Sequence, residues 1–161
     1  NDYVAVSDSA SLKPANAVTV EAWIKRKSIP GEQHIVAKGN VGATGYHLVV
    51  TGSTPVFVVG VQGLGGTTAI NDISKWYHLV GTWNGSTEKI YVNGVLEGTV
   101  AIGSIGTYNQ DLAIGRHSYA SGQFFNGLID QVRIYNRALT SSEIQKHYVQ
   151  GLEKYKNLTI K

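Results

Sequence analysis

The feature that most constrains the fold is an Asn-Gly pair, Asn93-Gly94, inside the stretch from Lys75 to Val100. A type I′ turn needs positive φ at both central residues, which this pair tolerates well, so the pair predicts a β-hairpin. An NGST turn at 84–87 precedes it, and apolar strand-like residues flank both turns. The stretch therefore predicts three consecutive strands in an antiparallel meander.

The rest of the chain repeats this pattern of short strands and turns. Val18–Lys25 alternates between apolar and polar residues, as a strand with one face in a core does. Glycine is frequent, with 19 residues, and proline is rare, with 3. Further strands are expected at His34–Gly39, Tyr46–Gly52, Pro55–Val61 and Asp111–Arg116. Many short strands at roughly 8–12-residue spacing predict an all-β, two-sheet antiparallel sandwich, or a barrel.

The last long strand contains an unusual acidic residue. In GLIDQVRIY, strict alternation places Asp130 on the same face as Leu128, Val132 and Ile134, which we expect to look into the core. An unpaired carboxylate in an apolar core is very costly. Asp130 therefore needs hydrogen bonds or a cation.

A short helix is expected after this strand. Thr140 and Glu143 have the spacing of a capping box, and Gly151 stands where a helix-terminating glycine belongs. We expect about two turns of helix. The domain is then residues 1–151, and 152–161 form a C-terminal tail or a final strand.

Composition excludes several partners. The net charge is +3, and the Lys25–Lys27 run is expected to be a solvated strand end, so nucleic-acid binding is not indicated. No apolar run approaches the ~20 residues of a membrane helix, so membrane insertion is not expected. There is no cysteine, and hence no disulfide. The chain opens on strand-like residues without methionine, and we expect a module tethered within a larger multidomain protein.

Three segments together resemble one known family. YVAVSDSASLKPANAVTVEAWIK, WYHLVGTWNGSTEKIYVNGVLEG and LAIGRHSYASGQFFNGLIDQVRIYNRALTSSEIQKHY are similar, in this order, to the laminin-G-like domains of the concanavalin A-like jelly-roll superfamily. The resemblance covers residues 3 to about 148. It implies two antiparallel sheets packed face to face and chain ends that lie close together. It also implies an extracellular or cell-surface recognition module that binds glycans or other proteins, often with calcium.

The resemblance suggests a structural Ca²⁺ site around Asp130. In calcium-binding relatives, an aspartate of the last long strand binds the ion together with backbone carbonyls from the first strand and from a glycine loop. Oxygen ligands in loose geometry suit Ca²⁺. Alternatively, Asp130 accepts backbone N–H groups or pairs with Arg133 or Lys38. The other positions that match the family's ligands are Asn1, Asp2, Lys38, Gly39 and Asn40.

Two polar-aromatic loops are the candidate ligand-binding segments, since function usually lies on loops held by a rigid scaffold. The alternative is that both are ordinary solvated loops. The first, RHSYASGQFF, offers Arg116, His117, Tyr119 and Gln123. The second precedes it and offers Tyr108, Asn109 and Gln110.

Tryptophan and histidine each allow a functional and a structural reading. Trp23, Trp76 and Trp83 could stack on sugars, but we expect them to pack within the sandwich. The five histidines are isolated in the sequence and lack metal-ligand spacing, so no zinc site is expected. His47 and His78 lie in strands opposite apolar faces, and we place them on the sheet surface.

No catalytic motif is present. Jelly-roll glucanases similar to this fold carry paired carboxylates on one strand as E-x-D-x-x-E, and retaining hydrolysis needs two carboxyl groups about 5 Å apart. Asp130 has no glutamate within four positions. We therefore expect a non-catalytic, carbohydrate-binding module. The alternatives are a protein-interaction or adhesion module of a surface protein, without a glycan ligand, and a structural spacer.

Overall fold

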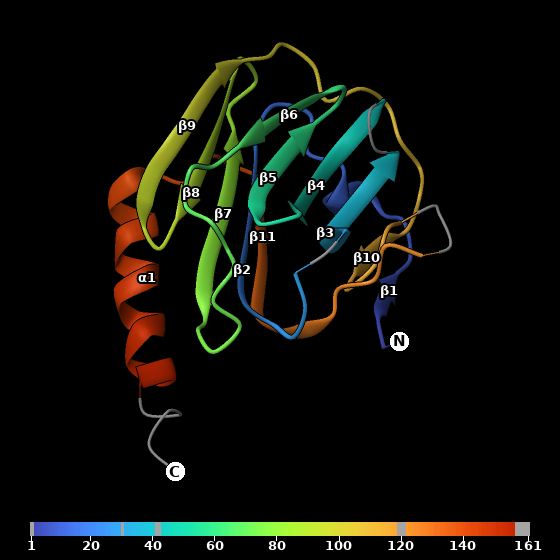
Figure 1. The fold of residues 1–161 in the computed structure, drawn as a ribbon. Coiled ribbons are helices and arrows are strands. Elements are labelled where there is room, and N and C mark those ends of the chain that lie inside the picture. Colours follow the sequence, from blue (N-terminus) through green and yellow to red (C-terminus); the bar gives the residue numbers. More distant parts are fainter. Residues whose placement is uncertain (1, 30, 41–42, 119–121, 157–161) are drawn as a thin grey trace.

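The computed structural model describes residues 2–29, 31–40, 43–118 and 122–156, and it confirms a sandwich of two antiparallel sheets with one C-terminal helix (Figure 1). The six-stranded sheet has the order β1 (Val4–Val6), β10 (Leu112–Ile114), β3 (Glu32–Asn40), β4 (Thr44–Thr51), β5 (Thr54–Val59), β6 (Gln62–Gly65). The five-stranded sheet has the order β11 (Gly127–Tyr135), β2 (Val18–Arg26), β7 (Tyr77–Trp83), β8 (Thr87–Val92), β9 (Val95–Ala101). A short 3₁₀ helix, η1 (Ala10–Leu12), lies between β1 and β2, and α1 (Ser141–Lys156) follows β11.

The predicted hairpins and meander are confirmed. Asn93 and Gly94 have φ of 51° and 80°, the left-handed conformation that the β8–β9 turn requires. Strands β7, β8 and β9 are neighbours in the sheet, as the two turns predict. The core fills the space between the sheets with inward-facing residues such as Val20 and Leu48. At Gly81 a Cβ atom would lie 2.1 Å from the Phe57 ring, so a glycine is needed where this ring from the opposite sheet packs on β7.

A β-bulge in β11 changes the phase of the last long strand. Asp130 pairs with Trp23 and Arg133 pairs with Glu21, so two residues of β11 face the single residue between them on β2. Gln131, in this bulge, has φ of 50°. The prediction that Asp130 faces the core with Leu128 is therefore wrong, because the bulge lets strict alternation fail. Both side chains lie on the outer face of the five-stranded sheet.

Helix α1 is longer than predicted. Its capping box is confirmed, because the Glu143 amide donates to Thr140 Oγ1 (3.3 Å) and the Thr140 amide donates to Glu143 Oε2 (2.8 Å). The prediction that Gly151 ends the helix is wrong, since the helix continues to Lys156. Gly151 instead lies against Trp23, where a Cβ atom would be 2.5 Å from the indole nitrogen.

The helix covers the outer face of the five-stranded sheet, on the side away from β3, β4 and β5 (Figure 1). The first strand lies across the molecule from α1, at the edge of the other sheet (Figure 1). The ends of the described chain are therefore far apart, whereas the resemblance implied that they lie close together. No helix in the described part of the chain has the length and apolar character needed to cross a bilayer.

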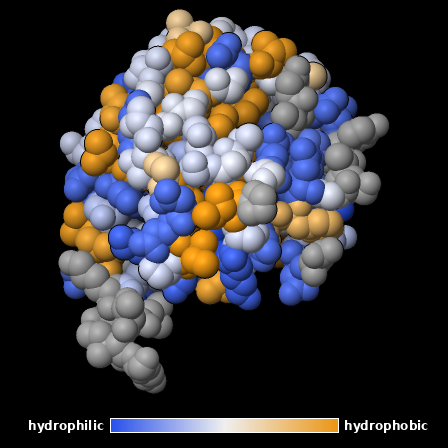
Figure 2. Space-filling view, viewed as in Figure 1, coloured by the Kyte–Doolittle hydropathy of each residue, from blue (hydrophilic) through white to orange (hydrophobic). Residues whose placement is uncertain are grey.

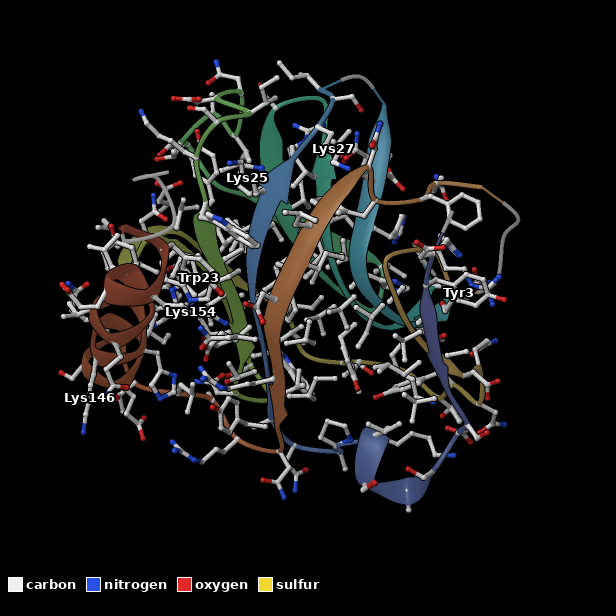
Figure 3. The ribbon with its side chains drawn as sticks, turned by 90° about the horizontal axis from the view of Figure 1, so that it is seen from below. Tyr3, Trp23, Lys25, Lys27, Lys146 and Lys154 are labelled. Carbon is white, nitrogen blue, oxygen red and sulfur yellow. The ribbon has the colours of Figure 1, made fainter. Side chains whose placement is uncertain are left out.

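The Lys25–Lys27 run is only partly solvated. Lys25 is half-buried and Lys27 is exposed, and both lie toward the end of β2 (Figure 3). Arg26 between them is 2% exposed and donates to the backbone carbonyls of Ile29, Gly52 and Ile70. Arg26 therefore anchors loops at this end of the sandwich, which charge patterning alone did not predict.

Candidate functional site

The Asp130 side chain pairs with residues of helix α1. Its Oδ2 accepts hydrogen bonds from Lys154 Nζ (2.5 Å) and the Tyr155 hydroxyl (2.8 Å), and its Oδ1 accepts from the Gln131 amide (2.7 Å). Partial burial would raise the pKa of Asp130, but these hydrogen bonds hold it below its ordinary value. Figure 3 labels Lys154 on α1 and Trp23 on the neighbouring strand β2.

The residues predicted to bind calcium do not surround one point. The Asp130 carboxylate lies on the outer face of the five-stranded sheet, whereas Gly39 and Asn40 end β3 in the opposite sheet. The Gly39 carbonyl accepts a hydrogen bond from Ser118 Oγ (2.5 Å), and Asp2 lies near the other end of β1 from these residues. These residues therefore do not fit a single Ca²⁺ site. Among the described residues, no group of three or more acidic, histidine or cysteine side chains could hold a metal ion; Asn1 lies outside them.

The alternative pairings of Asp130 are also resolved. Arg133 donates to Glu21 Oε1 (2.7 Å), and Lys38 donates to Asp8 Oδ1 (2.5 Å). Asp130 accepts from a backbone amide, as the alternative expected, but its cationic partner is Lys154. Nothing in the sequence between residues 130 and 154 indicated this pair, because it depends on where α1 docks.

Glu21 is a buried carboxylate that sequence reasoning missed. It is fully buried under α1, and its oxygens lie 2.7 Å from Arg133 Nη1, 2.9 Å from His147 Nδ1 and 3.2 Å from His78 Nε2. Burial raises the pKa of Glu21, and hydrogen bonds from His78 and His147 outweigh it and lower the pKa. Such a network holds a helix in place. His78, expected on the sheet surface, is fully buried here.

The tryptophans pack, as expected. Trp83 is 2% exposed in the core and Trp23 is 1% exposed. Trp23 lies between the sheet and α1, with its ring centroid 5.7 Å from that of Tyr148 and 4.6 Å from that of Tyr155. Trp76 stacks on Tyr155 at 4.4 Å. Trp23 and Trp83 are too buried to serve as a sugar platform, and one face of the partly buried Trp76 is covered by Tyr155.

The two predicted ligand loops lie in different places. Tyr108 is 5% exposed and packs edge-on against Tyr46 in the core, while Asn109 is exposed beside η1, within 3.4 Å of Lys13 Nζ. Arg116 and Gln123 lie instead near the start of β1 and β3. Tyr119 lies outside the described residues. The two loops therefore do not form one site.

Arg116 forms a site with Tyr3, which sequence reasoning did not select. The guanidinium carbon of Arg116 lies 3.9 Å from the centroid of the Tyr3 ring, and that ring remains 48% exposed. Phe124 lies at the edge, with a centroid distance of 6.4 Å. Tyr3 stands beside the segment that leads into β11 in Figure 3. The pairing of β1 with β10 brings Tyr3 and Arg116 together, and neither residue's local sequence indicates it.

A hollow of about 240 Å³ opens beside this pair, between the edge strands of the two sheets. We call it the Tyr3 hollow. It contains one acidic residue, one half-exposed aromatic ring and apolar walls. Its lining residues are Asp2, Tyr3, Val4, Ile114, Gly115, Phe125, Gly127 and Ile129.

Three histidines that are isolated in the sequence meet on the outer face of the six-stranded sheet. His34, His47 and His117 are buried, with ring centroids 4.6–5.9 Å apart. The prediction that His47 is a surface residue is therefore wrong, because the segment after β10 covers it. On the side of the molecule shown in Figure 2, small apolar patches alternate with polar side chains.

The fold and the Tyr3 hollow define a jelly-roll β-sandwich with a rim site rather than a deep cleft. The chain belongs to the concanavalin A-like lectin/glucanases superfamily, in a laminin G family whose model matches residues 1–145. This confirms the resemblance drawn from the three sequence segments.

Known proteins similar to this chain are larger. Human adhesion G-protein coupled receptor D1 is 32% identical over 85 residues, which are 50% of this chain and 10% of the receptor. A candidate carbohydrate-binding protein from Bacteroides ovatus superposes with a TM-score of 0.74 at 20% identity, covering 91% of this chain and 44% of that one. The binding domain of botulinum neurotoxin DC, in complex with rat synaptotagmin II, gives 0.68 at 16%, covering 92% and 40%. The two structures show the shared fold alone, and the chain spans less than half of each protein.

Proposed function

We propose that this domain is a non-catalytic, extracellular recognition module that binds a glycan at the Tyr3 hollow. The observation that carries the proposal is the half-exposed Tyr3 ring with the Arg116 guanidinium at 3.9 Å, set at the rim of a hollow. Sugar rings have apolar C–H faces and polar rims. An aromatic ring flanked by a guanidinium and a carboxylate offers both kinds of contact.

The size of the hollow suits one ring of a glycan. Its volume of about 240 Å³ is below the ~300–1,000 Å³ of pockets that enclose whole small molecules. Affinity for a single site should therefore be modest, and a larger parent protein would raise it by repetition. Among the residues that the structure describes, Asp2 is the one carboxylate that lines the hollow, which supports binding rather than two-carboxylate hydrolysis.

The similarity to known proteins supports the proposal. The B. ovatus match is a candidate carbohydrate-binding protein, and the human match is an adhesion receptor, which supports an extracellular place in a multidomain protein. A stabilising Ca²⁺ stays a proposal only at a place other than Asp130, Gly39 and Asn40, because these residues do not surround one point.

A glycan-array screen in millimolar calcium, with a chelator-treated aliquot beside it, tests this function. We expect binding by the wild type, a loss of at least about tenfold in Tyr3→Ala and Arg116→Ala, and retention in Tyr3→Phe. Asn109→Ala, in the other predicted loop, is the matched control and should bind normally. Absence of any glycan ligand would reject the function, and full binding by Tyr3→Ala would reject the site. Binding that is present in calcium and lost in the chelator-treated aliquot would support the proposal that the domain binds calcium.

A second function, protein recognition, is favoured by another surface. A hollow of about 600 Å³ lies between the β8–β9 turn and α1, next to exposed apolar side chains: Val95 is 60%, Leu96 44% and Val149 49% exposed. Exposed apolar patches commonly mark protein interfaces. A Val95→Asp/Val149→Asp variant that loses cell-surface binding, while Tyr3→Ala keeps it, would establish this alternative over glycan binding.

A further inference from the structure

The histidine cluster lies directly beneath the segment that carries Arg116. His34 on β3 and His47 on β4 project from the outer face of the six-stranded sheet, and His117 packs onto them from the chain after β10. The rings of His34 and His117 have centroids 4.6 Å apart, and each of the other two pairs is 5.9 Å apart. His117 is 6% exposed, and the other two are fully buried.

One carboxylate faces this cluster among the described residues. Glu32 Oε1 lies 2.8 Å from His34 Nε2 and accepts a hydrogen bond from Gln123 Nε2 (3.0 Å). The backbone at Thr44 is a polar neighbour of His47, and no side chain in the described part of the chain hydrogen-bonds its ring nitrogens. Arg116 is the cation of the covering segment, and its guanidinium lies on Tyr3. The sheet residues around the rings are apolar: Ala37, Val49, Val58 and Ala113.

Burial keeps the cluster neutral near pH 7. It lowers the pKa of His34 to about 4 and that of His47 to about 3, and it holds the pKa of His117 below its ordinary value. The neighbouring imidazoles lower these values further for His34 and His47, and Glu32 opposes the shift at His34. Three rings can share this space only while at most one is charged.

The covering segment, residues 115–118, is held at both ends by backbone carbonyls of β3. The Gly115 amide donates to Ile35 O (2.9 Å), and Ser118 Oγ donates to Gly39 O (2.5 Å). Arg116 and His117 lie between these two anchors. A movement of the backbone that lifts His117 from the sheet therefore also displaces Arg116 from Tyr3.

We propose that His34, His47 and His117 form an acid-sensitive latch, which releases the 115–118 segment and Arg116 from the sheet when the surroundings become acidic. A first added proton is balanced by Glu32, and a second places two cations in contact in a buried space. His34 and His47 are fixed on paired strands, so His117 is the ring that leaves for water. The consequence for ligand binding rests on the proposed function, because Arg116 flanks the Tyr3 hollow.

Linkage sets the direction and size of the effect. Once released, His117 titrates near its ordinary value of 6.5. Below that pH the released state binds a proton that the closed state lacks, so the ratio of released to closed segments rises about tenfold per pH unit for each histidine freed.

Hydrogen exchange of the whole chain, without any glycan, tests the latch. Protection factors, which correct for the intrinsic pH dependence of exchange, are compared at pH 7.5 and pH 4.5. We expect the Gly115 amide, which donates to Ile35 O, to lose at least tenfold protection at pH 4.5, while the amides of the β7–β8 hairpin keep theirs. His117→Leu, which fills the same space without a titrating group, should abolish the loss. His147→Gln, a histidine outside the cluster, should retain it.

Three results would overturn the latch: equal protection at both pH values, an undiminished acid response in His117→Leu, or a loss spread through the whole sandwich. If His117→Leu fails to fold, His47→Gln serves instead, and its response should move to lower pH. Because no ligand is present, a failed latch is distinguishable from a failed glycan site.

Discussion

The two outer faces of the sandwich bury titratable groups in opposite ways. On the five-stranded sheet, helix α1 covers Glu21, a carboxylate with an arginine and two histidines around it. On the six-stranded sheet, a loop segment covers three histidines that share one partly exposed carboxylate, Glu32. The first face is held by opposite charges, and the second is held only while at most one of its three histidines is charged.

This difference teaches how one fold can carry a permanent cover and a conditional one. Mild acid leaves the Glu21 carboxylate ionised, because its neighbours hold its pKa below the ordinary value despite its burial. The same acid places like charges beneath the 115–118 segment. Mild acid should therefore release the 115–118 segment and leave the ion pair beneath α1 intact.

Removing the Glu21 charge should cause the largest loss in the free energy of unfolding. Glu21→Gln leaves Arg133 and two histidines beneath α1 without a counter-charge, and we expect a loss of about 3 kcal/mol in the free energy of unfolding. Urea denaturation at pH 7 measures it. Asp72→Asn, which breaks an exposed pair with Lys75, is the control and should change stability far less. Equal losses in both variants would mean that the helix is held by packing alone.

Glu88 lies in the core, between the two sheets. Its titration changes stability with pH in the direction opposite to that of the three histidines. Glu88 is fully buried in phase with Ile90, its oxygens have no hydrogen-bond partner among the described residues, and burial raises its pKa to about 8. Between pH 4.5 and 8 the folded state holds a proton that the unfolded state has lost, so stability falls as pH rises through this window.

Glu88→Gln should therefore be more stable than wild type by about 4 kcal/mol at pH 8 and nearly equal at pH 4.5. It should also steepen the loss of stability that the histidines cause on acidification from pH 6.5, because the opposing group is gone. Denaturation curves across this range give the measurement. A variant whose profile parallels that of wild type would show that Glu88 is ionised in the fold.

Gly151→Ala tests the close contact of α1 with its sheet. The new methyl group would lie 2.5 Å from Trp23 Nε1, and overpacking of about 2 kcal/mol is partly offset by the higher helix propensity of alanine. We expect a net loss of about 1 kcal/mol. Gly103→Ala, where nothing lies within 4 Å, should be neutral in the same thermal melts. A stabilised Gly151→Ala would contradict the contact.

Asp130→Ala should have the smallest effect. Its partner Lys154 is half exposed, so the pair contributes less than about 1 kcal/mol. The melting temperature should fall slightly and equally with calcium and with chelator. A larger fall seen only in calcium would restore Asp130 as a calcium ligand.

Local patterns predicted the frame of this fold and little of its surfaces. The Asn93-Gly94 turn and the capping box at Thr140 depend on adjacent residues, and both were correct. The outward turn of Asp130 was not predictable, because Gln131 is an ordinary strand residue whose positive φ appears only with the β11–β2 register. The local sequence predicted that Gly151 ends the helix. Its observed role was not predictable, because it depends on contact with Trp23, more than a hundred residues away.

The candidate site shows the same limit more strongly. Arg116 was selected from its loop, but its partner Tyr3 comes from the pairing of β1 with β10. Tyr108 belongs to a segment with the composition of a binding loop, and yet its side chain lies in the core. His34, His47 and His117 meet only through the β3–β4 register and the path of the following loop. Composition selects candidates, and contacts between distant segments decide which of them share a site.

The placement of the tryptophans gives the protein an optical asymmetry. Trp23 stacks on His78 and Tyr148, and Trp76 stacks on Tyr155, so two of the three indoles report on the seating of α1. No tryptophan ring contacts the three histidines in the described part of the chain. Intrinsic tryptophan fluorescence should therefore change when the helix detaches and should not change with events on the opposite face. A single tryptophan introduced at the half-exposed ring, Tyr3→Trp, would give that silent side its own emission.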